Sequence, residues 1–294
     1  MAHPSESPIL ALKKAISGAA FSIAPERAEA LKNDPSLTKF SLVVTDDRGF
    51  TFRVDTSTHE AFLPIPAMEY VWCCGYLCWQ LYQAFIEAQE QERASVNTGE
   101  AVALSAAMGL FNWSKVNMYS PTYAGWPEGP CPLAQPEHGT AVHVANELFL
   151  ASLAWLIHHE IAHVRLGHGR AIKGLTAKQE EECDRQATEW ILNACPPDQL
   201  QKRQLGMVVA LFSMQFLDEP DGAESHVGSH PPSVDRIDYC LTTAAVEDDS
   251  LVAAFAATML LAQTTQLGIE EEATGQSFRD ILARLQVAFR TAGR

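Results

Sequence analysis

The chain has 294 residues, of which 47% are hydrophobic and 19% are charged, so it can bury a full core as one large or two small domains. This composition excludes the disordered and fibrous classes. The formal net charge of −15 makes the surface repel phosphate backbones and anionic lipid, and we expect no nucleic-acid partner. No apolar stretch reaches the roughly 18 residues of a membrane span, and the first residues lack the features of a signal peptide. We therefore expect a cytoplasmic protein.

The seven cysteines are odd in number and lack the spacing of a zinc ribbon, which fits a reducing compartment better than a disulfide framework. Cys73, Cys74 and Cys78 lie on the apolar side of a predicted helix. Free thiols in such positions usually pack as small hydrophobic groups, so we interpret the three as core residues. Metal binding or redox chemistry is the alternative.

The predicted elements begin with a short amphipathic piece at 10–16. Residues 40–55 then predict a β-hairpin, because apolar and polar residues alternate on both sides of the turn sequence Asp46-Asp47-Arg48-Gly49. After Pro66 the apolar period changes to that of a helix, which we expect over 71–85, and a second helix is expected over 98–113.

Residues 117–139 contain too much proline and glycine for a helix or an interior strand and predict a long structured loop. From residue 142 onward most segments have a helical period. The predicted fold class is α+β, mainly α. It divides into an N-terminal β-hairpin region at 1–65, a helical region with the Pro/Gly-rich loop at 66–140 and a helical core at 141–294, which could together form one continuous domain.

One helical segment carries an HExxH motif, His159-Glu160-Ile161-Ala162-His163. Histidines at i and i+4 lie on one helix face and can bind one Zn²⁺, with the glutamate beside the metal as general base. The alternative is a pair of ordinary core histidines, although ionisable groups are costly to bury on an apolar helix. We predict His159 and His163 as zinc ligands and Glu160 as the catalytic base.

A catalytic zinc site needs a third protein ligand and an open position for water. His168 has the wrong offset from His163 to share its helix face, so we expect it not to be a ligand. On a downstream predicted helix, Glu180 and Asp184 share a face, and we predict Glu180 as the third ligand and Asp184 as the acceptor that orients a metal-binding histidine. Glu181 is the main competitor, and three consecutive glutamates also suit a helix N-terminus without any metal.

These motifs resemble those of known proteases. HExxH followed by Glu-x-x-x-Asp-x-x-Ala resembles the gluzincin metallopeptidases, which implies a zincin-like catalytic domain. The later stretch at 229–237 resembles the His-Pro and Arg-Ile segment of the membrane-associated heat-shock and prenyl-protein proteases of that clan. Chain length, motif placement and the lack of membrane spans are most similar to the Lit-type phage-exclusion peptidases, bacterial proteases whose known member cleaves elongation factor Tu.

The resemblance covers residues 158–237 and implies Zn²⁺ as the cofactor, held by the ligands named above. It also implies a donor that stabilises the oxyanion, which His230 or His226 could supply, with Arg236 holding their segment down. Without that role, His230-Pro231-Pro232 is a rigid turn before a helix. The chain departs from the clan at Cys183, where alanine or serine is usual, and in having no transmembrane helices.

The sequence thus predicts a soluble zinc endopeptidase acting on a cytosolic protein. Phage exclusion by cutting a host translation factor, elongation factor Tu, is implied by the resemblance alone, as are low basal activity and an activating peptide. We expect the substrate backbone to lie along an extended segment at 114–121.

Two other functions remain open from the sequence. The main alternative is a zinc-stabilised binding or regulatory protein with a degenerate peptidase fold. A fourth ligand such as His168 or Cys183 would favour this alternative, whereas the intact Glu160 favours catalysis. A zinc hydrolase that acts on a substrate other than protein is the third candidate.

Overall fold

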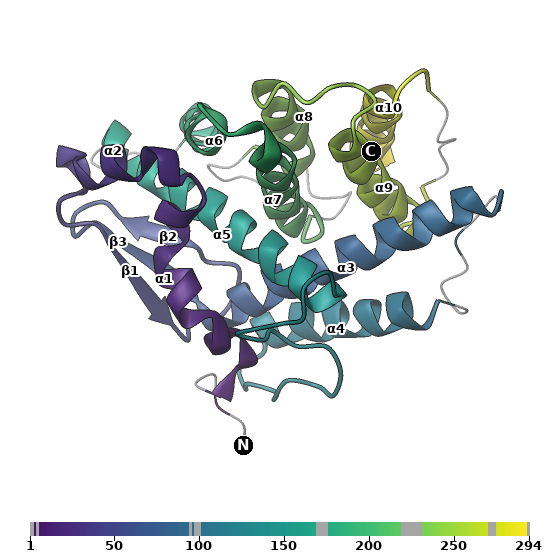
Figure 1. The fold of residues 1–294 in the computed structure, drawn as a ribbon, viewed down its shortest axis with the longest axis horizontal. Coiled ribbons are helices and arrows are strands. Elements are labelled where there is room, and N and C mark those ends of the chain that lie inside the picture. Colours follow the sequence, from purple (N-terminus) through teal and green to yellow (C-terminus); the bar gives the residue numbers. More distant parts are fainter. Residues whose placement is uncertain are drawn as a thin grey trace.

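A computed structural model describes residues 6–93, 101–168, 176–218, 231–269 and 275–292, together with His3 and Val96. Most of these residues are helical, and one small sheet lies at one end of the molecule (Figure 1). The prediction of a mainly α-helical α+β fold is confirmed. The α-helices are α1 (Lys13–Ser22), α2 (Ala28–Lys32), α3 (Ile65–Glu90), α4 (Val102–Tyr119), α5 (Ala141–Leu166), α6 (Ala177–Leu192), α7 (Pro197–Gln215), α8 (Ser233–Thr243), α9 (Leu251–Gln266) and α10 (Phe278–Ala292); the strands are β1 (Ser41–Thr45), β2 (Arg53–Asp55) and β3 (Glu60–Pro64).

The sheet has the order β1-β3-β2, in which β1 pairs with β3 in parallel and β2 pairs with β3 antiparallel. The predicted hairpin within 40–55 is therefore wrong, because the hairpin joins β2 to β3. Its turn is fixed by Asp55, whose carboxylate accepts the backbone N–H groups of Ser57 at 2.8 Å and Thr58 at 3.2 Å. The central strand carries the buried residues Ala61 and Leu63, and its position between two neighbours satisfies both of its edges.

Helix α3 begins at Ile65, between Pro64 and Pro66, and its first twelve residues, 65–76, are all buried. Cys73, Cys74 and Cys78 on this helix are free thiols, and all three are fully buried in one hydrophobic core that extends from Ile9 to Phe289. Burial raises the pKa of the Cys73 and Cys74 thiols, so both remain protonated. This environment matches their interpretation as core residues.

Helix α4 continues to Tyr119 and so includes most of the segment expected to be extended. The expectation of a substrate-binding strand at 114–121 is wrong, because the backbone of residues 114–119 is engaged in helical hydrogen bonds. The buried residues Leu110, Ser114 and Met118 continue the helix face at intervals of four.

Helix α5 runs through the centre of the molecule and packs against α1, α3, α6 and α7 (Figure 1). Of the part of the chain that the structure describes, α5 is the helix long and apolar enough to cross a membrane, and 67% of its apolar window is buried inside the protein. Such burial is typical of a core helix. The HExxH motif therefore lies on a largely buried helix at the centre of the fold.

Helix α5 ends at Leu166 and is followed by Gly167, which has a left-handed φ of 68°. The N–H groups of Gly167 and His168 donate to the carbonyls of Val164 at 3.2 Å and His163 at 3.0 Å. This pattern is a Schellman end, in which glycine avoids the strain that a Cβ atom would cause. It turns the chain back over the last turn of the helix.

Helices α5 and α7 approach each other closely at Gly206. A Cβ atom on Gly206 would lie 2.3 Å from the Cβ atom of Ala151. The hydroxyl of Ser152 on α5 donates to the carbonyl of Gly206 at 2.8 Å. The missing side chain thus lets α7 support the helix that carries the motif.

Candidate metal centre

His159 and His163 lie on consecutive turns of α5 and direct their Nε2 atoms to the same point. The two Nε2 atoms are 3.1 Å apart, and the ring centroids are 4.9 Å apart. Both side chains are buried, at 6% and 4% exposure. The i, i+4 spacing of the motif therefore brings two imidazole nitrogens together inside the protein.

Glu180 reaches the two histidines from the first turn of α6. A capping box fixes the start of this helix, because the Thr176 hydroxyl accepts the N–H of Gln179 and the Gln179 side chain accepts the N–H of Thr176. The Glu180 carboxylate is fully buried, with Oε2 3.2 Å from His159 Nε2 and Oε1 3.6 Å from His163 Nε2. Glu181 is exposed instead, so the structure places Glu180 beside the histidines.

The donor atoms of His159, His163 and Glu180 fit a tetrahedral zinc ion. Bonds of about 2.0–2.1 Å at tetrahedral angles separate neighbouring ligand atoms by about 3.3 Å. Here the two Nε2 atoms are 3.1 Å apart. Oε2 of Glu180 is 3.2 Å from Nε2 of His159, and Oε1 of Glu180 is 3.6 Å from Nε2 of His163. Among the described residues this cluster has three members, which leaves a fourth position for water or substrate.

Asp184 lies one turn after Glu180 and accepts a hydrogen bond from Nδ1 of His159 at 2.8 Å. Arg236 on α8 donates to the same carboxylate through Nε and Nη2, each at 2.7 Å. Burial raises the pKa of Asp184, but the charge of Arg236 and the contact with His159 outweigh that effect and lower it. The carboxylate is therefore ionised and fixes the Nδ1–H tautomer of His159, with Nε2 facing the cluster.

The electrostatic field at the cluster favours a positive charge. Burial lowers the pKa of His159, but the hydrogen bonds of Asp184 and Glu180 outweigh it and raise the pKa to about 9. A proton or a metal cation at Nε2 of His159 lies beside the carboxylate of Glu180, while Asp184 holds Nδ1. The charges of the cluster therefore suit a divalent cation.

The other residues of the motif differ in position. Glu160 is half-buried on α5 beside the two histidines. His158 points away from the cluster, and its Nε2 atom contacts the carbonyl of Ala20 at 2.9 Å while its ring stacks on Trp190. Burial lowers the pKa of His158 to about 3, so this ring is neutral. His158 is thus a packing residue rather than part of the cluster.

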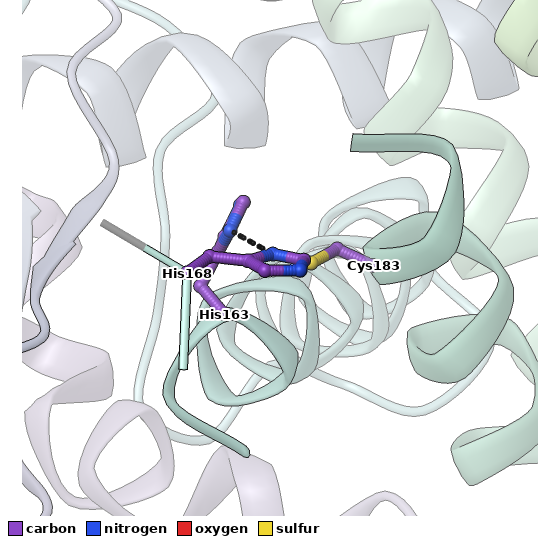
Figure 2. Close-up of side chains that lie close together, drawn as sticks. All are labelled: His163, His168 and Cys183. Carbon is purple, nitrogen blue, oxygen red and sulfur yellow. Dashed lines mark hydrogen bonds between the residues drawn. The ribbon is translucent and has the colours of Figure 1, made fainter. Parts of the chain in front are cut away.

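His168 and Cys183 lie beside the cluster but outside it. Nδ1 of His168 is 3.1 Å from Nδ1 of His163 and 3.5 Å from Sγ of Cys183 (Figure 2). His168 therefore approaches Nδ1 of His163, the ring nitrogen that is not directed to His159, and Cys183 contacts His168. Neither His168 nor Cys183 belongs to the set of donor atoms formed by His159, His163 and Glu180.

Two of the predicted site residues, His226 and His230, lie outside the described residues. Arg236, which was expected to hold their segment, contacts Asp184. The sequence analysis missed this buried ion pair and the contact between His168 and Cys183. The sequence did contain a sign of the ion pair. Arg236 falls between Val234 and Ile237 on the apolar side of the amphipathic helix α8, where an arginine needs a buried partner.

The comparisons with known proteins point to peptidases. The Peptidase U49 family matches residues 63–256 of the chain. The chain is also 30% identical to "Cell death peptidase" of Escherichia coli (strain K12) over 286 residues, which covers 95% of this chain and 96% of that relative. No solved structure matches the chain. The family match includes both helices of the cluster and the arginine on α8.

Proposed function

Because the chain belongs to the Peptidase U49 family, we propose that it is a zinc-dependent endopeptidase of the gluzincin type with a zincin-like catalytic domain. The observation that carries the proposal is the cluster of His159, His163 and Glu180, whose donor atoms have the separations that a tetrahedral ion requires. Zinc in this position supplies a water of lowered pKa and polarises the scissile carbonyl.

The side chains around the cluster have separate roles in proton transfer, in orienting a ligand and in stabilising the oxyanion. Glu160 takes a proton from the attacking water and passes it to the leaving amine. Asp184 holds His159 in the tautomer that leaves Nε2 free of a proton, and Arg236 balances the charge of Asp184. His230 donates a hydrogen bond to the developing oxyanion. This role for His230 rests on the family resemblance, since the residue lies outside the described part of the chain.

The substrate that we propose is a cytosolic protein, namely the host translation factor elongation factor Tu. The resemblance to the Lit-type peptidases and the name of the Escherichia coli relative, "Cell death peptidase", support this proposal. The protein would act in the cytoplasm during phage exclusion. A protease that cuts an essential host factor must be inactive until needed, so the proposal includes a phage-derived activating peptide.

Metal analysis tests the cluster. Wild-type protein should contain zinc near one equivalent per chain, Glu160→Gln should retain it, and Glu180→Ala should lose or weaken it. Glu181→Ala is the matched control, because the exposed Glu181 is the neighbour of Glu180 on the same helix. Folded wild-type protein that neither contains nor takes up zinc would overturn the zinc proposal.

Cleavage tests the activity separately. Purified elongation factor Tu is incubated with the zinc-loaded protein, with and without peptides from a phage lysate, and fragments are identified by mass spectrometry. Glu160→Gln should reduce the rate by about 10²–10⁴-fold with zinc still bound. A zinc-loaded wild type that cleaves no protein of a host lysate under either condition would instead support the non-catalytic alternative.

A further inference from the structure

His163 has two ring nitrogens, and the cluster with His159 and Glu180 uses one of them. Its Nε2 atom faces the cluster, whereas its Nδ1 atom lies 3.1 Å from Nδ1 of His168. A histidine that binds a metal usually directs its second nitrogen to a carboxylate, a carbonyl or water. Here the second nitrogen faces another potential ligand.

A thiol completes this second group of donor atoms. Cys183 projects from α6 with Sγ 3.5 Å from Nδ1 of His168 (Figure 2). The donor atoms of His163, His168 and Cys183 all lie within 4.8 Å of one another. The group thus combines two imidazoles and one thiol at a single point.

We propose that His163, His168 and Cys183 form a second metal site, which takes a soft or borderline divalent ion such as Zn²⁺ or Cd²⁺. The site shares the ring of His163 with the first cluster, one metal on each nitrogen. Its existence does not require catalysis, although any effect of its occupation on peptidase activity rests on the proposed function.

The distances suit such an ion. Zinc bonds of about 2.3 Å to sulfur and 2.0–2.1 Å to nitrogen, at tetrahedral angles, separate S and N by about 3.6 Å and two N atoms by about 3.3 Å. The observed separations from His168 are 3.5 Å to sulfur and 3.1 Å to nitrogen. Thiolate and imidazole together favour zinc and softer ions over Mg²⁺ or Ca²⁺.

The fold positions these ligands without help from a metal. The Schellman end at Gly167 returns the chain so that the N–H of His168 bonds to the carbonyl of His163. Cys183 follows Glu180 by three residues, so one helix presents a ligand to each site. His168 is half-buried, and Cys183 is fully buried.

The local charge also favours a cation. The negative charges of four carboxylates, those of Glu160, Glu180, Glu182 and Asp184, are felt at the Cys183 thiol, and the same charges attract a cation. Binding of a divalent ion releases the thiol proton of Cys183 and the Nδ1 proton of His163, so the two new ligands each carry one negative charge. These two negative charges balance the charge of the divalent ion.

The experiment uses metal-free protein titrated with Cd²⁺ and, separately, with Co²⁺. Bound metal is counted by elemental analysis after gel filtration, and the thiolate-to-metal charge-transfer band is recorded in the ultraviolet. Wild-type protein should bind two equivalents and develop the band. Cys183→Ser and His168→Ala should each lose the band and one equivalent, whereas Cys195→Ser, which changes a half-buried thiol elsewhere, should keep both.

Glu180→Ala separates this proposal from the peptidase proposal. It should lose one equivalent and keep the band, because Cys183 and His168 remain. A wild type that binds one equivalent with the band, unchanged by Glu180→Ala, would support the second site and overturn the first. A wild type without the band, indistinguishable from Cys183→Ser, would overturn the second site and leave His168 as a hydrogen-bond partner of His163.

Discussion

Arg236 and Asp184 form a buried, bidentate ion pair. Both hydrogen bonds are 2.7 Å long, and the arginine is 7% exposed. The pair joins α8 to α6 and, through His159, to α5. The orientation of one proposed zinc ligand therefore depends on a residue 52 positions after Asp184.

Replacing Arg236 by lysine should weaken zinc binding about 10–100-fold, because lysine keeps the charge but cannot hold both oxygens of Asp184. Competition with a fluorescent zinc chelator measures the effect. The control is Arg290→Lys, which changes a half-exposed arginine paired with Asp235 and should leave zinc affinity unchanged. Equal zinc affinity in both variants would contradict the orienting role of Arg236.

Gly206 is predicted to be intolerant of any side chain. Gly206→Ala places a methyl group 2.3 Å from Ala151 Cβ and 2.9 Å from its carbonyl carbon, so we expect a loss of about 1–3 kcal/mol in the free energy of unfolding. Gly109→Ala is the control, because nothing lies within 4 Å of its Cβ position in α4, and it should stabilise by about 0.4–1 kcal/mol. Urea unfolding measures both, and equal effects would refute the close approach of α5 and α7.

The N-cap of α6 should affect both stability and metal binding. Thr176→Ala removes the acceptor for the N–H of Gln179 and should cost about 0.5–2 kcal/mol. It should also weaken zinc binding, because Glu180 lies in the first turn of this helix. Ser250→Ala removes the equivalent cap of α9 and should lower stability with zinc affinity unchanged. Thermal unfolding and zinc competition distinguish the two outcomes.

The pair of Glu26 and Arg203 should make stability fall in acid. The hydrogen bond from Arg203 lowers the pKa of Glu26 below its ordinary value of 4.5. A carboxyl group with a lowered pKa stabilises the fold above its ordinary value, and this contribution is lost as the pH falls through the folded-state pKa.

Glu26→Gln should therefore lower the free energy of unfolding at pH 7 by about 1.5–3 kcal/mol and reduce its decrease below pH 4.5. Glu29→Gln breaks an exposed ion pair with Lys32 and should change stability by less than about 1 kcal/mol. Unfolding curves between pH 3 and 7 provide the comparison. The interpretation fails if Glu26→Gln and wild type keep parallel pH profiles.

Local patterns account for the parts of this structure that the sequence predicts. The spacing of His159 and His163 is enough to place two imidazoles on one helix face, and helical spacing relates Glu180 to Asp184. The choice of Glu180 over Glu181 depends on how α6 is rotated toward α5. The bond of 3.0 Å between Trp155 and Thr188 contributes to that rotation, and it joins residues 33 positions apart.

The features that the sequence did not predict depend on contacts between separate elements rather than on local patterns. The strand pairing depends on which strand takes the central position, with a neighbour on each side, and here that strand is β3. The alternating patterns of 40–44 and 50–54 do not show which strand is central. His168 is off the helix face that His163 presents to the cluster, as its offset indicates. The left-handed residue Gly167 nevertheless returns His168 to the other nitrogen of the same ring.

The chain of contacts from His159 through Asp184 to Arg236 also has a consequence for biosynthesis. A nascent chain that has emerged as far as α6 already carries both motif histidines and Glu180, but the arginine that balances Asp184 is still to be translated. Until α8 folds against α6, that carboxylate lacks its buried counter-charge. Completion of the candidate metal centre is thereby coupled to the emergence of a later segment of the chain, because His159 gains its fully balanced partner Asp184 when α8 is in place.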